Sequence, residues 1–195
     1  MGDLELNRAR TALLMADFHA DSMGVNPVVK ERHTFERAGE VLDAARQAGV
    51  FVVYIVVNFR TDYPEISEMN QTFSERKAAG QPPAADPAAL IHESVLPRQG
   101  EPIVVKHRVN AFFGTDLDMI LRAQGRDTLI LVGHATSGVI LSTIRYAADA
   151  DYRLVVVEDG CADRDPEVHT ILMEKVFPRQ ATVASTLDVV TALAG

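Results

Sequence analysis

The stretch 128-TLILVGHATSGVILSTIRYAADADYRLVVVED-159 decides the fold class of this chain. Its two ends, TLILVG (128–133) and RLVVVED (153–159), are short, nearly continuous runs of branched apolar residues, as in strands that are buried on both faces. Between them, residues 138–151 carry apolar side chains at three- and four-residue spacing, which is the pattern of a helix packed on one side. Two buried strands joined by a helix predict a parallel pair within an α/β sheet.

The same alternation extends through the rest of the chain. It predicts further strands at 11–18, 50–59 and 101–106, further helices at 36–49 and 115–125, and a short edge strand at 181–186 before a last helix. We therefore expect one domain over residues 1–195, with an open parallel sheet of about six strands between two helical layers. Residues 60–100 contain five prolines and no clear apolar period, which predicts a functional loop or a partner contact.

Composition limits the kinds of partner. A formal net charge of −8 argues against nucleic acid and anionic membranes, because binding phosphates requires clustered Lys and Arg. The first twenty residues lack a basic start followed by an apolar run, and no apolar stretch approaches the length of a membrane span. The single cysteine, Cys161, cannot form an internal disulfide. We expect a cytoplasmic protein that acts on a small molecule.

The ends of the predicted strands provide the candidate site residues, because ligands of open parallel sheets bind outside the carboxyl ends of the strands. These ends carry Asp17, Phe18 and His19; Asn58, Phe59 and Arg60; Lys106, His107 and Arg108; Gly133, His134 and Ala135; and Glu158 and Asp159. A carboxylate and an amine brought to one crevice, such as Asp17 and Lys106, form either an acid/base pair or a structural ion pair. The residues alone leave both readings open.

Aromatic and cationic side chains near these ends suggest the kind of substrate. Phe18, Phe59, Phe112 and Phe113 offer apolar walls, and Arg60 offers a forked donor that suits a carboxylate. These residue types favour a small, flat, anionic molecule. The alternative is that the phenylalanines belong to the core or to a dimer contact.

Three segments together resemble the isochorismatase-like, or cysteine hydrolase, superfamily: TALLMADFHAD (11–21), VVKHRVNAFFGTDLDMILRAQGRDTLILVG (104–133) and GHATSGVILSTIRYAADADYRLVVVEDGCAD (133–163). The resemblance covers nearly the whole chain. It implies a six-stranded parallel sheet flanked by helices and assembly into homodimers or larger homo-oligomers. It also implies hydrolysis of an amide, such as nicotinamide or a carbamoyl compound, or of the vinyl ether of isochorismate.

In the amidases of this superfamily an Asp, a Lys and a Cys form the site. The resemblance places the Asp at Asp17, the Lys at Lys106 and the nucleophile position at Val139, which leaves only a backbone amide there. Cys161 follows the fifth predicted strand, so we interpret it as a small, partly buried apolar residue. The superfamily pattern therefore predicts an acid/base pair without a thiol nucleophile.

The isochorismatase branch of the superfamily also lacks the cysteine. Resemblance to this branch implies that Asp17, with a pKa raised by burial, acts as an acid that protonates the enol carbon of the substrate, while Lys106 orients Asp17. The N–H groups of Gly138 and Val139 would then bind a substrate carboxylate or oxyanion. Two residues depart from that branch: Val139 is bulkier than the small residue expected there, and His19 stands where the family commonly has Gln.

We predict no metal and no cofactor. Nicotinamidase-like members bind a divalent ion through an Asp and two His near the end of the second strand, where this chain has Asn58, Phe59 and Arg60. The residues predicted to line the substrate site are Phe18, His19, Phe59, Arg60, His134 and Gly138. The sequence favours acid-catalysed hydrolysis by Asp17 of a small anionic substrate such as the vinyl ether of isochorismate. The alternatives are hydrolysis of an amide or imine by water that Asp17 activates, and binding of a ligand without catalysis.

Overall fold

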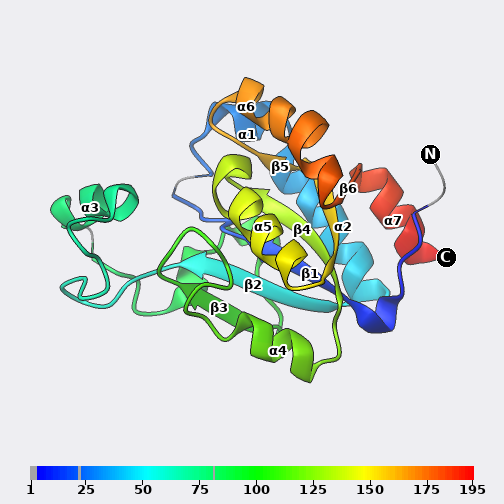
Figure 1. The fold of residues 1–195 in the computed structure, drawn as a ribbon, viewed down its shortest axis with the longest axis horizontal. Coiled ribbons are helices and arrows are strands. Elements are labelled where there is room, and N and C mark those ends of the chain that lie inside the picture. The colour runs from blue at the N-terminus through cyan, green and yellow to red at the C-terminus, as the bar shows by residue number, and fades with distance from the viewer. Residues whose placement is uncertain (1–3, 22, 81) are drawn as a thin grey trace.

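Six parallel strands run side by side through the computed structural model, which describes residues 4–21, 23–80 and 82–195 (Figure 1). The strands are β1 (Thr11–Ala16), β2 (Phe51–Val57), β3 (Ile103–Lys106), β4 (Thr128–His134), β5 (Arg153–Ala162) and β6 (Thr182–Ala184). Their order across the sheet is β3-β2-β1-β4-β5-β6. The direction of winding reverses between β1 and β4, which makes the carboxyl ends of these two strands the expected place for a ligand.

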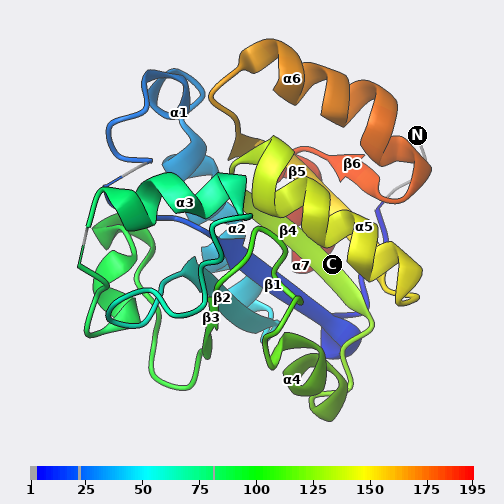
Figure 2. The same cartoon turned by 60° about the vertical axis from the view of Figure 1, so that its left-hand side comes forward.

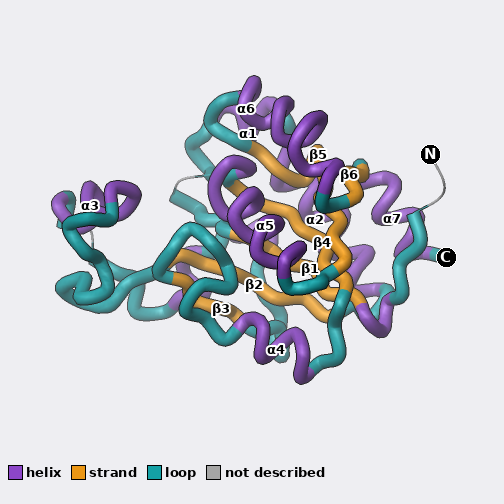
Figure 3. The backbone as a smooth tube through the Cα atoms, viewed as in Figure 1, coloured by secondary structure: helices purple, strands orange, loops and turns teal. Residues whose placement is uncertain are grey.

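Helices cover both faces of the sheet, as the purple and orange segments of Figure 3 show. They are α1 (Pro27–Glu31), α2 (Thr34–Gln47), α3 (Gln71–Ala78), α4 (Leu117–Ala123), α5 (Leu141–Asp149), α6 (Pro166–Ile171) and α7 (Thr186–Ala194). One face packs against α2 and α7, and the other packs against α4 and α5. In the described part of the chain, no helix combines the length and the apolar character needed to cross a bilayer.

The sequence pattern explains both layers. Every residue of β1 is buried, as expected for a strand covered by helices on both faces. Ala38, Val41, Leu42 and Ala45 of α2 are buried, and their spacing puts them on one side of the helix. After α2, Gly49 has a φ of 68°, the left-handed conformation that commonly ends a helix. The α/β class, the parallel sheet and the six strands predicted from the sequence are confirmed.

Strand β5 differs from its prediction in length. It continues to Ala162 instead of ending at Asp159, so Cys161 lies within the strand and not after it. Five residue steps of β5, from Val156 to Cys161, span the same stretch as two steps of β4, from Leu131 to Gly133. This bulge carries Glu158 and Asp159 out of the regular ladder.

Residues 60–100 contain more regular structure than predicted, including α3 and two short 3-10 turns. The part that carries α3 projects beyond the sheet (Figures 1 and 2). No residue of α3 is buried, and Phe59, Tyr63 and Ile66 form a small apolar cluster of their own. Asn58 closes the base of this arm, since its side chain donates to the carbonyl of Ala84 (2.9 Å) and accepts from its N–H (3.2 Å). A partner contact by the arm and a homo-oligomer stay predictions.

Candidate active site

Four strand ends meet at the carboxyl edge of the sheet and bring the predicted pair together. Ala16, which precedes Asp17, pairs with Ile55 of β2 and Gly133 of β4, while Lys106 at the end of β3 pairs with Val57. Gly133 lies so close to β1 that a Cβ on it would stand 2.1 Å from the carbonyl oxygen of Ala16. Only a glycine allows this approach, which holds the start of the next turn beside Asp17.

Asp17 and Lys106 form a buried ion pair. Lys106 Nζ lies 2.8 Å from Asp17 Oδ2, and the two side chains expose 2% and 14% of their surface, respectively. Asp17 Oδ1 accepts a hydrogen bond from the backbone N–H of Val57 at 3.1 Å and lies 3.5 Å from His19 Nε2. Lys106 Nζ also donates to the carbonyl of Arg108 at 3.2 Å. The predicted pairing of Asp17 with Lys106 is therefore present in the structure.

The backbone at Asp17 turns sharply out of β1. Its φ is 53°, a left-handed conformation that Asp tolerates better than most residues. Its N–H donates to the carbonyl of Ile55 at 2.8 Å, and its carbonyl accepts from the N–H of His19 at 2.7 Å. These bonds fix the direction of the carboxylate toward the end of β3.

The charge state of Asp17 corrects one prediction. Burial opposes the ionised form, but the nearby Lys106 and the hydrogen bond and charge of His19 outweigh it, so the pKa of Asp17 lies below its ordinary value. The sequence predicted a pKa raised by burial, because it could not give the short distance to Lys106. At neutral pH the side chain is a carboxylate, which accepts protons and does not donate them.

Two histidines lie next to this carboxylate. His19 is buried, and the N–H of Val57 lies 3.3 Å from its Nε2 as well as close to Asp17. His134, also buried, lies 3.2 Å through Nε2 from the side-chain nitrogen of Asn26, the residue that caps α1. Burial lowers the pKa of His134 most, while the charges of Asp163 and Asp17 oppose that change. His134 is therefore uncharged at neutral pH, and α1 lies against the site.

Val139 lies in the turn that joins β4 to α5. A π-helical turn, η4 (Thr136–Ile140), follows β4, and Val139 within it is 2% exposed and belongs to the core cluster on the α5 side. The N–H of Gly138 already donates to the carbonyl of Ala135 at 3.0 Å. In the predicted anion site, the N–H of Gly138 is therefore not free to bind a substrate. The sequence could not reveal this hydrogen bond, because it forms inside the turn.

Asp163 is a site residue that sequence reasoning missed. It follows β5 and is buried, and its Oδ2 accepts a hydrogen bond of 2.6 Å from the N–H of Ser137 in the β4–α5 turn. The strand-end rule would have selected Asp163 if β5 had been given its full length. With the shorter strand, that rule selected Glu158 and Asp159, which lie in the bulge.

Three predicted substrate-binding residues lie elsewhere. Phe18 is 1% exposed and packs in the core on the α2 side, with its ring 5.9 Å from that of Phe35. Phe59 belongs to the small cluster of the arm, and Arg60 is exposed and pairs with Glu65 at 3.0 Å. Their positions in the sequence, directly after strands, did not reveal that the chain turns into the core at Phe18 and into the arm at Phe59.

The loop after Lys106 separates its two phenylalanines. Phe112 is buried and stacks on Tyr146 of α5, with ring centroids 4.8 Å apart, so it is a packing residue. Phe113 is exposed. The open alternative between core and substrate wall is thus resolved for Phe112 in favour of the core.

Cys161 lies in the core and away from solvent. Its Sγ lies 3.8 Å from the carbonyl oxygen of Leu131, and burial raises the pKa of its thiol to about 12. A thiol in this state is a poor nucleophile. The predicted interpretation of Cys161 as a small apolar residue agrees with this burial.

The described cavities are lined by neither Asp17 nor Lys106. One, of about 680 Å³, is lined by residues such as Arg10, Asp127 and Arg153, and the other, of about 920 Å³, lies between the first described residues, β6 and α7. Among residues 4–21, 23–80 and 82–195, no three His, Cys, Asp or Glu side chains are placed to hold a metal ion.

Comparison with known proteins gives one consistent result. The isochorismatase domain family matches residues 11–188. The uncharacterized isochorismatase family protein YecD of Escherichia coli O157:H7 is 32% identical, over 97% of this chain and 100% of its own. Maleamate amidohydrolase of Pseudomonas putida is 29% identical, over 78% of this chain and 71% of its own. The structure of an isochorismatase family protein from Burkholderia thailandensis superimposes with a TM-score of 0.81 at 26% identity, covering 98% of each chain.

Proposed function

The chain belongs to the isochorismatase family, and on this premise we propose that it hydrolyses a small carboxamide with water activated by the Asp17 carboxylate, without a thiol nucleophile. The observation that carries the proposal is the buried contact of 2.8 Å between Asp17 Oδ2 and Lys106 Nζ. This contact favours an ionised aspartate in a site that is largely closed to solvent. Such a group is in the form that can accept a proton at neutral pH.

The carboxylate has room for one more donor. An ionised Asp accepts about four hydrogen bonds. The N–H of Val57 and the amine of Lys106 donate to it, and His19 Nε2 lies 3.5 Å from its Oδ1. A water molecule can therefore bind Asp17 while Lys106 stays in place. In the proposed step, the water oxygen bonds to the amide carbon and its proton passes to Asp17, which then gives it to the leaving nitrogen as the C–N bond breaks.

Lys106 has two roles in this proposal. Its charge keeps Asp17 ionised before the reaction, and after proton transfer it stabilises the negative charge that develops on the substrate oxygen. The backbone carbonyl of Arg108 holds the amine on its other side. His134, uncharged at neutral pH, is available as a hydrogen-bonding group for the substrate.

Relatives support an amide as the substrate. The name of maleamate amidohydrolase describes the hydrolysis of an acid amide, and its sequence aligns with 78% of this chain. The charge of Arg164 acts on His134, so a cation lies within electrostatic reach of the site. We therefore propose a small acid amide, in keeping with the anionic substrate expected from the sequence.

Acid-catalysed hydrolysis of a vinyl ether is the second candidate. It requires a protonated Asp17 near neutral pH, and the lowered pKa of Asp17 weighs against it. Binding without catalysis is favoured by no particular contact. The two hydrolytic candidates differ in the protonation state of Asp17, which must be ionised to act as a base and protonated to act as an acid.

A substrate panel distinguishes them. Maleamate, other small acid amides and isochorismate would be incubated with the parent chain, Asp17→Asn and Lys106→Met, with ammonia release and pyruvate release measured separately. We expect ammonia from at least one amide, incorporation of ¹⁸O from labelled water into the acid product, and loss of turnover in Asp17→Asn. Pyruvate release without ammonia would instead support the acid reaction, and no turnover of any compound would contradict hydrolysis.

A further inference from the structure

A second chain of polar contacts reaches the β4–α5 turn from behind. Thr136 Oγ1, in the first residue of η4, lies 2.8 Å from His169 Nδ1, and the other ring nitrogen, Nε2, lies 3.1 Å from Glu158 Oε1. Arg32 Nη2 contacts the same carboxylate oxygen at 2.5 Å. Thr136 and His169 are 0% and 1% exposed. Four residues from four parts of the chain thus form one row, which is buried at Thr136 and His169 and partly exposed at Glu158 and Arg32, whose side chains expose 41% and 26% of their surface.

The chemistry of the row fixes where the protons lie. The Arg32 and His169 contacts hold Glu158 ionised, with a pKa of about 2, so its carboxylate only accepts hydrogen bonds. His169 Nε2 must therefore carry a proton. In the neutral ring Nδ1 is then an acceptor, and the hydroxyl of Thr136 donates to it.

This row has the connectivity of a hydroxyl, imidazole and carboxylate triad, yet its position excludes that use. A nucleophile must reach substrate, and the Thr136 side chain is wholly buried. What the row contacts is the turn that carries Val139. Asp163 holds the neighbouring residue of the same turn through the N–H of Ser137.

We propose that Glu158 and His169 are positioning residues, which hold the β4–α5 turn beside Asp17 by fixing the hydroxyl of Thr136. The inference rests on the proposed function only in taking this turn as a wall of the site. Second-row groups of this kind fix the orientation of the groups that meet a substrate. The bond through Arg32 extends the same row to the end of α1, whose first-turn cap, Asn26, lies against His134. Through His169 and Arg32, the carboxylate of Glu158 therefore connects the β4–α5 turn with α1.

Two measurements test the proposal without requiring turnover. The first is hydrogen exchange of the peptide over residues 133–142, measured by mass spectrometry in the parent, Thr136→Val, Thr136→Ser and His169→Asn. We expect about tenfold faster exchange in Thr136→Val, because a buried acceptor loses its donor. Exchange in Thr136→Ser should return close to the parent value, since the hydroxyl is restored. His169→Asn keeps reach to Thr136 but not to Glu158, so it should fall between them.

The matched control is Thr170→Val. It makes the same chemical change one residue from His169, at an exposed hydroxyl that donates to the carbonyl of Pro166 within its own helix. We expect no change in exchange at residues 133–142 in this variant. Equal exchange in Thr136→Val and Thr170→Val would overturn the proposal. If Thr136→Val does not fold, His169→Asn and Thr136→Ser still decide it.

The second measurement is the ¹⁵N spectrum of the histidine rings in the native chain at neutral pH, with His169 assigned by its absence in His169→Asn. The proposal expects a proton on Nε2, and a ring protonated only at Nδ1 would contradict it. A covalent adduct on Thr136 after treatment with an activated ester would make Thr136 a nucleophile and also contradict it. Because neither measurement uses a substrate, failure of amide hydrolysis leaves this test intact.

Discussion

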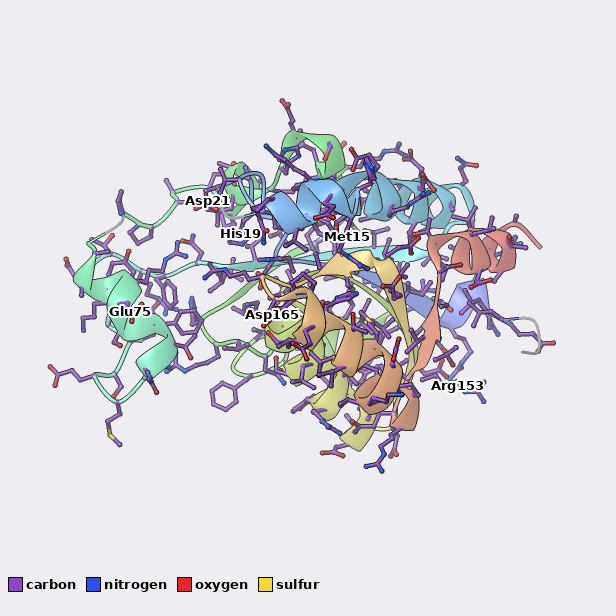
Figure 4. All side chains as sticks on the ribbon, turned by 90° about the horizontal axis from the view of Figure 1, so that it is seen from above. Met15, His19, Asp21, Glu75, Arg153 and Asp165 are labelled. Atoms are coloured by element: carbon purple, nitrogen blue, oxygen red, sulfur yellow. The ribbon has the colours of Figure 1, made fainter. Side chains whose placement is uncertain are left out.

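The two edges of the sheet combine space and charge in opposite ways. At the amino edge, Arg10 and Asp127 pair on the surface with side chains 58% and 41% exposed, beside a cavity of about 680 Å³. At the carboxyl edge, the side chains of Lys106 and Asp17 pair with 2% and 14% of their surface exposed, and neither residue lines one of the two described cavities. Figure 4 labels Arg153 and His19 toward these opposite edges.

The difference separates two properties that are often used together to locate a site. A hollow indicates where a molecule fits, and the cavity of about 680 Å³ lies at the amino edge. A buried charge pair is costly to form and is strongly disturbed when one partner is removed, so it marks a place where the charge itself has a role. We therefore assign the chemistry to the carboxyl edge, and the predictions below test that assignment.

The largest effect is expected from removing the charge of one aspartate at each edge. Asp17→Asn should lower hydrolysis of a responsive amide by about 10²- to 10⁴-fold, as for loss of a general base. Asp127→Asn should leave the rate near that of the parent. Steady-state rates of the two variants on the same amide measure this. Equal losses, or a greater loss in Asp127→Asn, would move the active site to the amino edge.

The second effect concerns stability. Lys106→Met leaves Asp17 buried without its partner and should lower the free energy of unfolding by about 3–5 kcal/mol. Arg10→Met removes an exposed partner and should leave the denaturant midpoint almost unchanged. Urea unfolding of both variants gives the comparison. If Lys106→Met is as stable as the parent, the pair at the carboxyl edge is not the strongly coupled contact that the site requires.

The third effect is the pH dependence, for which the sign follows from the lowered pKa of Asp17. Because the folded-state pKa lies below the unfolded value, ionised Asp17 stabilises the fold above the ordinary aspartate pKa of 3.8, and this is lost as the pH falls through the folded pKa. The hydrolysis rate should therefore stay level with respect to Asp17 from about pH 5 to 8.

The outcome that decides between base and acid is the position of the low-pH limb. An acid-side midpoint near pH 6 that is absent in Asp17→Asn would indicate that the pKa of Asp17 is raised. It would then favour the mechanism in which Asp17 acts as an acid. The pKa of Asp127 is also lowered, mainly by its hydrogen bond from Arg10. A pH–rate curve of Asp127→Asn that matches the parent would confine the effect to the carboxyl edge.

The smallest effect is expected at the one native thiol. Cys161 is buried with its pKa raised to about 12, so iodoacetamide at pH 8 should neither label the folded chain nor reduce its activity. Mass spectrometry before and after unfolding checks this, because the denatured chain should accept one label. If the folded chain were labelled rapidly and lost activity, Cys161 would be an accessible nucleophile that contributes to the activity.

The sequence predicted the parts of the fold that depend on periodicity. Continuous apolar runs located every strand, and the spacing in α2 located its buried side. It missed α1, α3 and α6, which are short and begin with Asn or Asp caps, and not with a long apolar period. For the site, the strand-end rule found Asp17, Lys106 and His134 because strand ends of one sheet share an edge.

What the sequence could not give depends on distances between distant segments. The direction of the pKa shift of Asp17 follows from the position of Lys106 and His19, and burial alone predicts the opposite direction. Phe18 follows a strand as His19 does, yet it turns into the core. The contact of Thr136 with His169 joins residues 33 apart, and nothing in the local pattern of either residue indicates it.

The bulge in β5 depends on the number of residues between Val156 and Cys161. Removing three residues there would restore a regular ladder between β4 and β5, while Gly133 and His134 keep Cys161 and Ala162 as partners. Asp163 would therefore keep its place beside Ser137, but Glu158, which contacts His169, would be lost with the bulge. In an alignment of relatives, a gap opposite residues 157–160 therefore predicts the loss of the contact between Glu158 and His169, even where every aligned side chain is identical.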